Sequence, residues 1–219
     1  MKRYIHILAT VILIIASSCA DEKYNDRMLL SDIVTISEAG ADKPVTFTFR
    51  RYDDSPLITL KALNGSVDKE WTGHRILLRY YPESGEAYTS GNVTVAAMSA
   101  INYDTVRVRE VEKYDWKASP VFLNSVWRTG QYLNMRMRVE YSPSPRLFGL
   151  MVDSLTVDSI QPQLYLLHNR LGEPENYLTE IYASFDLSPL WDRPGCRSIK
   201  VHINDTNHKE DFYIFQKPE

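Results

Sequence analysis

The sequence predicts an all-β protein whose short strands fall into two sets, and three observations support this class. Runs of β-branched and aromatic residues recur about every ten to fifteen positions, which is typical of sandwiches and barrels. Tyrosine, which favours strands, occurs 14 times in the 219 residues. Segments with the 3.6-residue period of an amphipathic helix are scarce. We therefore expect strands joined by tight turns.

The first 22 residues have the pattern of an export signal. Lys2 and Arg3 precede an apolar run over residues 7–15, and the small residues 16–18 then lead to Cys19. A charged start, a short apolar stretch and small residues before the cut are the parts of a secretory signal. A membrane-spanning helix needs about 20 apolar residues, so this run is too short to be one. We expect residues 1–18 to be a lipoprotein signal peptide.

Cys19 stands at the first mature position, where a bacterial lipoprotein is acylated. The leucine that usually lies three residues earlier is replaced by Ala16. The other cysteine of the chain is Cys196, which has no disulfide partner if Cys19 carries lipid. Ordinary cleavage is the alternative, and it would allow a disulfide between the two cysteines. We favour lipidation, with residues 19–30 as a tether to the membrane.

The tether and the charge of the mature chain bear on location and partners. Residues 20–23 (ADEK) resemble the acidic export tag of some surface-displayed lipoproteins, and a plain charged linker is the alternative. We expect a Gram-negative outer membrane, with either the surface or the periplasmic face as the location. Removing Lys2 and Arg3 from 25 basic residues leaves 23 against 28 acidic ones, a balance of −5. This charge argues against nucleic acid as a partner.

The first set of strands is expected in a domain over residues 31–115. Val45, Phe47 and Phe49 alternate with polar residues, as the two-residue period of a half-buried strand requires. Glycine-containing turns separate the runs. The expected strands cover residues 33–36, 45–50, 57–60, 75–81, 92–97 and 105–111.

The second set is expected in a domain over residues 120–219. A charged, tryptophan- and proline-containing segment at 112–120 interrupts the alternation, and we interpret it as the domain boundary. One continuous fold is the alternative. A short helix is expected over 154–161, since Pro162 would end it. Six strands favour a β-sandwich, and they cover residues 132–141, 147–152, 163–168, 182–187, 198–203 and 212–215.

Motifs of catalysis are missing from the sequence. It has no Gly-x-Ser-x-Gly, His-Glu-x-x-His or Cys-x-x-Cys pattern and no glycine-rich phosphate loop. We therefore expect no catalytic residue, no cofactor and no metal, although carboxylates from distant strands keep a hydrolase open. His202 and His208 flank Asp205 in an expected hairpin, where a solvated turn is favoured over a metal site.

Tryptophan and arginine side chains are the remaining candidates for binding. Trp116 and Trp191 lie beside charged or proline-containing segments, so they are the better candidates for an exposed platform that stacks on sugars. A tryptophan in a β protein is more often part of the core or an interface. Arginines alternate with apolar residues at 106–109 and 135–138, and a solvated sheet face explains these basic stripes without a ligand.

Several segments together resemble the NigD-like lipoproteins of Gram-negative anaerobes, over nearly the whole mature chain. Residues 73–80 (GHRILLRY) are similar to the family's Gly-x-Arg-Val-Leu-Val strand. Residues 123–127 (LNSVW) lead through Gly130 into 132–134 (YLN), although Arg128-Thr129-Gly130 replaces the glycine-rich turn of many relatives. Two further segments, 167–169 (LHN) and 184–188 (SFDLS), are similar to strands of the family's second domain.

The resemblance implies an N-terminal OB-type Greek-key barrel followed by a C-terminal β-sandwich. OB barrels elsewhere hold oligonucleotides or oligosaccharides on an exposed sheet face. The family brings no established activity and no catalytic residues. We expect a non-enzymatic envelope lipoprotein that binds a surface protein or a glycan, with a glycan hydrolase and a purely structural component as alternatives.

Overall fold

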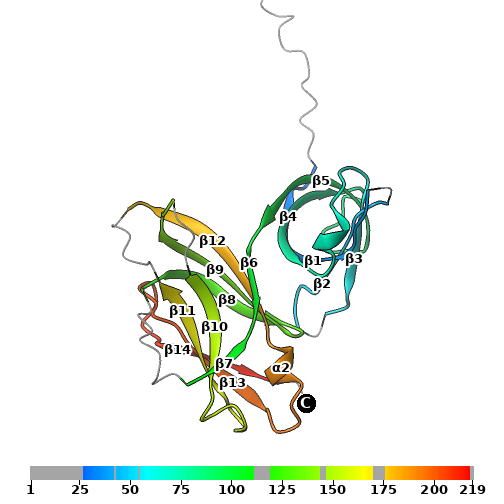
Figure 1. Ribbon diagram of the computed structural model, residues 1–219. Coiled ribbons are helices and arrows are strands. Elements are labelled where there is room, and N and C mark those ends of the chain that lie inside the picture. The colour runs from blue at the N-terminus through cyan, green and yellow to red at the C-terminus, as the bar shows by residue number, and fades with distance from the viewer. Residues whose placement is uncertain are drawn as a thin grey trace, which may run out of the picture.

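The computed structural model in Figure 1 describes residues 27–41, 43–53, 55–110, 119–143, 147–169 and 176–217. The expected signal peptide, Cys19 and most of the tether lie outside these residues, and so does Trp116. The described part is nearly all strand, which confirms the predicted fold class. It contains a closed barrel and two facing sheets.

Five strands form the barrel, in the closed order β1-β2-β3-β5-β4. They are β1 (Leu30–Glu38), β2 (Thr46–Phe49), β3 (Ile58–Ala62), β4 (Arg75–Pro82) and β5 (Gly91–Ala100). Strands β3 and β5 pair in parallel, and the other neighbours pair antiparallel. A single 3₁₀ turn, η1 (Lys69–Trp71), connects β3 to β4. This topology is the OB-type Greek-key barrel that the resemblance implies.

The alternating apolar residues of these strands fill the inside of the barrel. Successive side chains of a strand point to opposite faces, so every second residue faces inward. The expected alternation of Val45, Phe47 and Phe49 is confirmed, because all three are buried. The same core contains Val34, Ile36, Ile58, Leu60, Ala62, Ile76, Leu78, Tyr80 and Val93.

Two sheets pack against each other to form the sandwich. The four-stranded sheet has the order β6-β12-β9-β8, with β6 (Asn102–Thr105), β12 (Leu178–Asp186), β9 (Tyr132–Glu140) and β8 (Phe122–Thr129). The five-stranded sheet has the order β14-β13-β11-β10-β7. Its strands are β14 (Phe212–Gln216), β13 (Ser198–His202), β11 (Gln163–Asn169), β10 (Leu147–Asp153) and β7 (Arg107–Arg109).

Strand β9 shows how the sequence pattern builds the sandwich core. Its residues Leu133, Met135, Met137 and Val139 are buried against the other sheet, as the alternation predicted. Strand β8, which was not among the expected strands, pairs with β9 along its whole length. The four-stranded sheet therefore exposes its other face, and the barrel lies on that side (Figure 1).

The transition between the two sets of sheets lies earlier than the expected segment 112–120. Strand β6 pairs with β12 and β7 pairs with β10, so both belong to the sandwich although they fall inside the range expected for the first domain. The chain thus leaves the barrel at Ile101. Alternation reveals a strand but not its partner, which is why the sequence could not locate this change.

The helix expected over 154–161 is wrong, because the segment forms turns and bends. The carboxylate of Asp153 accepts a hydrogen bond from Leu155 N at 3.0 Å, and its carbonyl accepts one from Thr156 N at 3.0 Å. An aspartate side chain that binds the backbone two residues on stabilises a turn instead of a helix. The short helix of the described chain is α2 (Ser188–Trp191).

Candidate functional site

A groove runs between the barrel and the exposed face of the four-stranded sheet. Its larger part is a hollow of about 570 Å³, walled by β4, β5, the start of β6, and β12. A smaller hollow of about 100 Å³ shares Leu77 and Tyr182 with the first. It is lined in addition by Asp32, Arg51 and Trp127. We call the two together the interdomain groove.

The groove lies where the outward-facing residues of a pleated sheet meet the barrel. On β12, Glu180, Tyr182 and Ser184 alternate with residues that face the sandwich core. The register pairs Tyr182 with Arg136 and Ser184 with Asn134 on β9, so these polar side chains share one face. That face supplies one wall of the groove, and β4 supplies the opposite wall.

Arg75 joins the barrel to the four-stranded sheet. It begins β4 of the barrel and is only 4% exposed. Its Nε donates to Ser184 Oγ at 2.6 Å and its Nη2 donates to Asn134 Oδ1 at 3.1 Å, both in the sandwich. Its Nη1 donates to Thr35 Oγ1 at 2.9 Å, and its guanidinium lies 3.9 Å from the ring centroid of Tyr132. Residues from both halves therefore hold the same buried cation.

Burial lowers the pKa of Arg75 to about 10, because the charged form loses contact with water. The guanidinium still carries its charge at neutral pH. Its hydrogen-bond partners on the sandwich are the Ser184 hydroxyl and the Asn134 amide. A hydrogen bond from a charged donor is stronger than one between two neutral groups. Arg75 belongs to the segment GHRILLRY, so this part of the resemblance corresponds to a contact between the halves.

A second contact joins the β2–β3 loop of the barrel to the β8–β9 turn. Asp53 forms an ion pair with Arg128, and its Oδ1 accepts a hydrogen bond from Gly130 N at 2.8 Å. Gly130 has φ +57°, a left-handed conformation that glycine adopts at little cost. The Arg128 guanidinium lies 4.3 Å from the ring centroid of Trp191. Burial lowers the pKa of Arg128.

Trp191 is 6% exposed, so the expectation that it is an exposed platform is wrong. Helix α2 turns the ring toward the sandwich core, and Arg128 covers it. The proline at the start of α2, which suggested a surface segment, instead sets the first turn of this helix. Trp116, the other predicted platform residue, lies outside the described residues.

Some charged side chains on the groove walls have a partner of opposite charge within the described chain, whereas Arg79 does not. Glu180 accepts hydrogen bonds from Arg136 Nε at 2.8 Å and from the Tyr182 hydroxyl at 2.9 Å. Burial acts to raise the pKa of Glu180, but these hydrogen bonds lower it. Arg79 is exposed on the opposite wall and has no hydrogen-bond or ion-pair partner among the described residues. The larger hollow therefore presents one uncompensated positive charge.

Asp32 and Arg51 complete the smaller hollow. Burial raises the pKa of Asp32, against the effect of a 3.1 Å hydrogen bond from the Tyr80 hydroxyl. The Arg51 guanidinium stacks 3.6 Å from the ring centroid of Tyr88 and acts on Asp32 by charge. The walls thus combine aromatic rings with charged groups, which is a composition suited to orienting a polar ligand.

The two histidines of the expected hairpin have structural partners. The His202 ring stacks on Tyr165 at 4.6 Å between centroids, and His208 Nδ1 lies 2.7 Å from Asp205 Oδ2. Asp205 Oδ1 also accepts a hydrogen bond from Leu123 N at 3.0 Å, so this carboxylate joins the loop to β8. Among the described residues, no three histidine, cysteine or acidic side chains form a group that could hold a metal ion.

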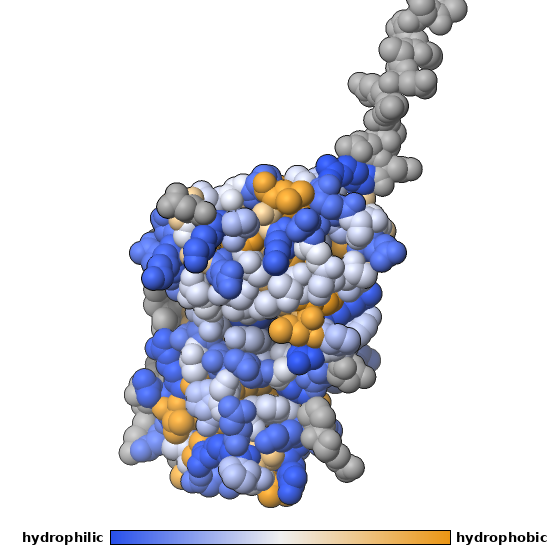
Figure 2. Space-filling view, turned by 90° about the vertical axis from the view of Figure 1, so that its right-hand side faces the viewer, coloured by the Kyte–Doolittle hydropathy of each residue, from blue (hydrophilic) through white to orange (hydrophobic). Residues whose placement is uncertain are grey.

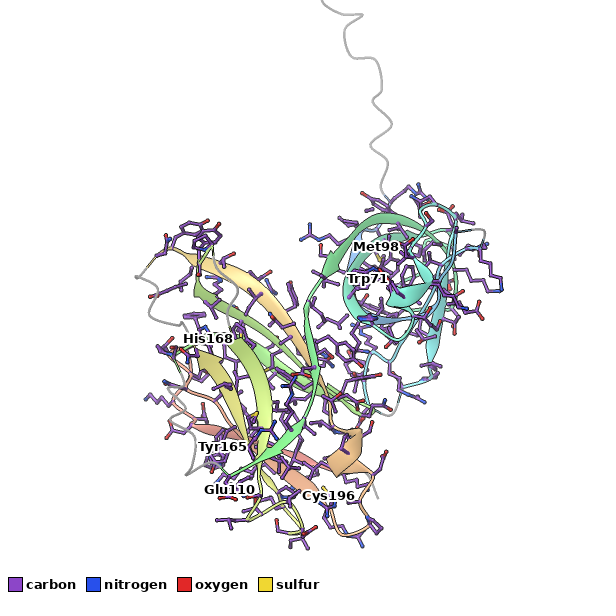
Figure 3. All side chains as sticks on the ribbon, in the orientation of Figure 1. Trp71, Met98, Glu110, Tyr165, His168 and Cys196 are labelled. Atoms are coloured by element: carbon purple, nitrogen blue, oxygen red, sulfur yellow. The ribbon has the colours of Figure 1, made fainter. Side chains whose placement is uncertain are left out.

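Cys196 is a buried free thiol, and burial raises its pKa. Figure 3 shows it in the part of the sandwich away from the barrel. Each of the two basic stripes contains an arginine that pairs with a carboxylate. Arg107 pairs with Asp104 at 2.7 Å, and Arg136 pairs with Glu180 in the groove.

Sequence reasoning did not single out Tyr182 or Arg79 as site residues, and it ranked Trp127 behind Trp116 and Trp191 as a platform for sugars. The first two lie in strands that the alternation predicted, and Trp127 lies in a segment of the family resemblance. The pattern marks Arg79 and Tyr182 as outward-facing, but it does not show that their two strands face each other. Only the docking of the barrel on the sheet brings them into one groove.

The chain matches the family model described as the NigD-like C-terminal beta sandwich domain over residues 104–217. This match begins inside β6, in agreement with the change of sheet partners at Ile101. No curated protein matches the chain.

Three solved structures resemble the whole fold. A protein of unknown function from Bacteroides vulgatus is 20% identical, with a TM-score of 0.67 and coverage of 88% of this chain and 92% of that one. A NigD-like immunity protein from Bacteroides caccae is 18% identical, with a TM-score of 0.61 and coverage of 89% and 99%. A candidate lipoprotein from Bacteroides fragilis is 11% identical, with a TM-score of 0.58 and coverage of 86% and 97%. At these identities the likeness concerns the fold alone.

Proposed function

Because the chain belongs to the NigD-like family, we propose that it is a lipid-anchored envelope protein that binds a glycan or protein partner without catalysis, in the interdomain groove. The name of the Bacteroides fragilis neighbour agrees with a lipoprotein. Cys19 would carry the acyl chains, and these chains would insert into the outer membrane. Two acyl chains suffice for stable attachment, whereas one alone binds marginally.

Within the part of the chain that the structure describes, every helix is too short or too polar to span a bilayer. The acidic segment at 20–23 supports display on the cell surface, where a glycan or another surface protein is accessible. The periplasmic face is the alternative location.

The observation that carries the proposal is the pairing of aromatic and charged groups in a groove fixed by buried contacts. Tyr182 and Trp127 offer ring surfaces, and Arg79 offers a cation without a partner in the described structure. The Arg75 and Asp53 contacts hold the two walls in one arrangement before a ligand arrives. A preformed site binds more tightly because less freedom is lost on binding.

The test uses the full lipidated protein in detergent, applied to a printed glycan array and to solubilised envelope. Tyr182→Ala and Arg79→Ala should each lower the captured glycan or protein at least tenfold, since each removes a wall of the larger hollow. Arg109→Ala, an exposed arginine on β7 outside the groove, is the matched control and should bind as the wild type does. Equal capture by all three variants would remove the groove from consideration.

A second candidate function, a glycan hydrolase, is favoured by the two carboxyl groups of the groove. Asp32 lines the smaller hollow and has a raised pKa, whereas Glu180 lines the larger hollow and has a lowered one. A hydrolase would use two such carboxyl groups as acid and base on one bound glycan. A hydrolase would release new reducing ends from a glycan that binds on the array. Asp32→Asn would then bind the glycan but release none, whereas a binding protein releases none in either form.

A further inference from the structure

Strand β14 forms an edge of the five-stranded sheet and presents an apolar surface. It is the last strand in the sheet order, with β13 as its neighbour. Phe212 is 42% exposed and Ile214 is 46% exposed, while Tyr213 and Phe215 pack against the core. Proteins usually protect such edges with charges, prolines or covering segments. On the face drawn in Figure 2, by contrast, apolar residues form small patches separated by polar ones.

The hydrogen bonds to β13 show which backbone groups of β14 remain for another strand. Ile203 N donates to the carbonyl of Asp211 at 3.2 Å, and Lys217 N donates to the carbonyl of Arg197 at 2.7 Å. In an antiparallel pair, the residues that bond to one neighbour alternate with those that bond to the other side. The N–H and C=O groups of Phe212, Ile214 and Gln216 therefore point away from β13.

The charges at the two ends of β14 select an orientation. Glu210 and Asp211 precede the strand, and Lys217 follows it. Antiparallel pairing of two copies centred on Ile214 places Asp211 opposite Lys217 of the partner subunit, twice. Parallel pairing would instead place like charges side by side, which is unfavourable.

From this edge, which no strand of the described residues covers, and from this charge pattern, we infer that β14 pairs with β14 of a second copy of the chain, antiparallel and centred on Ile214. Phe212 lies opposite Gln216 of the partner subunit, and the two Ile214 side chains meet on the two-fold axis. The outward-pointing backbone groups on each edge then gain partners, and both exposed apolar side chains lose part of their contact with water. Two five-stranded sheets become one continuous sheet.

The paired edge is separate from the interdomain groove. No residue of β14 lines either hollow, and β14 lies across the sandwich from the barrel (Figure 1). Each subunit of the dimer therefore keeps its groove open. Lys217 donates from Nζ to the carbonyl of Trp191 at 2.6 Å, and the remaining ammonium hydrogens are free to meet the partner's Asp211.

Cysteine substitution tests the register directly. Opposed residues in a hydrogen-bonded antiparallel pair have Cα atoms about 5.5 Å apart, a distance that a disulfide spans. Ile214→Cys in the full chain in detergent should therefore give a covalent dimer under mild oxidation. Phe212→Cys is the matched control, with similar exposure on the same face, but two copies of it would lie about 13 Å apart. It should give no covalent dimer, and neither should the wild type.

Cross-linking of neither variant, or of both equally, would overturn the proposed pairing.

A second measurement uses sedimentation of charge variants of the full chain. Asp211→Lys alone and Lys217→Asp alone should each weaken self-association about tenfold, because two ion pairs per dimer become repulsive. An equimolar mixture of the two variants restores both pairs and should associate as the wild type does. Failure of the mixture to recover, with each variant folded by circular dichroism, would also contradict the pairing.

Discussion

Arg75 Nε lies 2.6 Å from Ser184 Oγ, although the two residues are 109 positions apart in the chain. The bond connects the start of β4 in the barrel to the last third of β12 in the sandwich. The same guanidinium reaches Asn134 on β9, so one buried cation bonds to two adjacent strands of the sheet. The two β modules are linked covalently at Ile101, and this contact, together with that of Asp53 and Arg128, holds them in a fixed relation, so the interdomain groove keeps its shape.

Replacing Arg75 should destabilise the protein strongly. Arg75→Ala leaves Ser184 and Asn134 buried without their donor, and lost hydrogen bonds to a charged group cost about 1.5–3 kcal/mol each. We expect a loss of about 3–5 kcal/mol in the free energy of unfolding, measured with urea. Arg79→Ala, four residues along the same strand and exposed, should change it by less than about 0.5 kcal/mol. Similar losses in both variants would contradict the role given to Arg75.

Replacing Trp191 should mainly lower the stability of the folded protein, and only secondarily its binding. The ring is buried under Arg128, and truncating a buried tryptophan to alanine costs about 3–5 kcal/mol. We expect Trp191→Ala to show a loss in this range by thermal or urea unfolding. Trp71→Ala is the comparison, because Trp71 is an exposed barrel residue and should cost much less. A stable Trp191→Ala variant would argue that the ring is not packed as described.

The acidity of Asp32 predicts a pH dependence of stability. Burial raises its pKa in the folded state above the ordinary value of 3.8 that applies in the unfolded chain. The neutral form is thus favoured by folding, so this contribution is fully present below pH 3.8 and is lost as the pH rises through the folded pKa. Asp32→Asn should therefore gain stability relative to the wild type between pH 3.5 and pH 7. Parallel unfolding curves at every pH would show that Asp32 titrates normally.

Lipidation of Cys19 should be visible by metabolic labelling. Cells grown with labelled palmitate are expected to incorporate it into the wild-type protein and not into Cys19→Ser. The variant should also leave the membrane fraction, because the short apolar run at 7–15 cannot serve as a membrane span. Cys196→Ser should keep the label, since its thiol is buried. Absence of label from the wild type would refute the anchor.

Local pattern was sufficient to find most strands. The alternation in β9 predicted four of its buried residues, because a pleated strand with one wet face has a fixed two-residue period. The expected strand ran one residue too far, since β9 ends at Glu140 and Tyr141 is exposed. Strand β8 was missed, since a bulge between Leu123 and Ser125 breaks its alternation. The helix over 154–161 was wrong, because side-chain hydrogen bonds from Asp153 favour a turn over the helical backbone.

The sequence by itself determined an all-β protein with two strand sets that resemble the NigD-like family, and it predicts an export signal with a cysteine placed for lipidation. These properties depend on patterns among residues that are close together in the sequence, so they can be recognised without the structure. Only the tertiary structure decided that β6 and β7 join the sandwich, that Trp191 is buried, and that Arg79 and Tyr182 face one groove. Each of these depends on which distant strands pair and which faces meet, and a period of two residues carries no information about the partner.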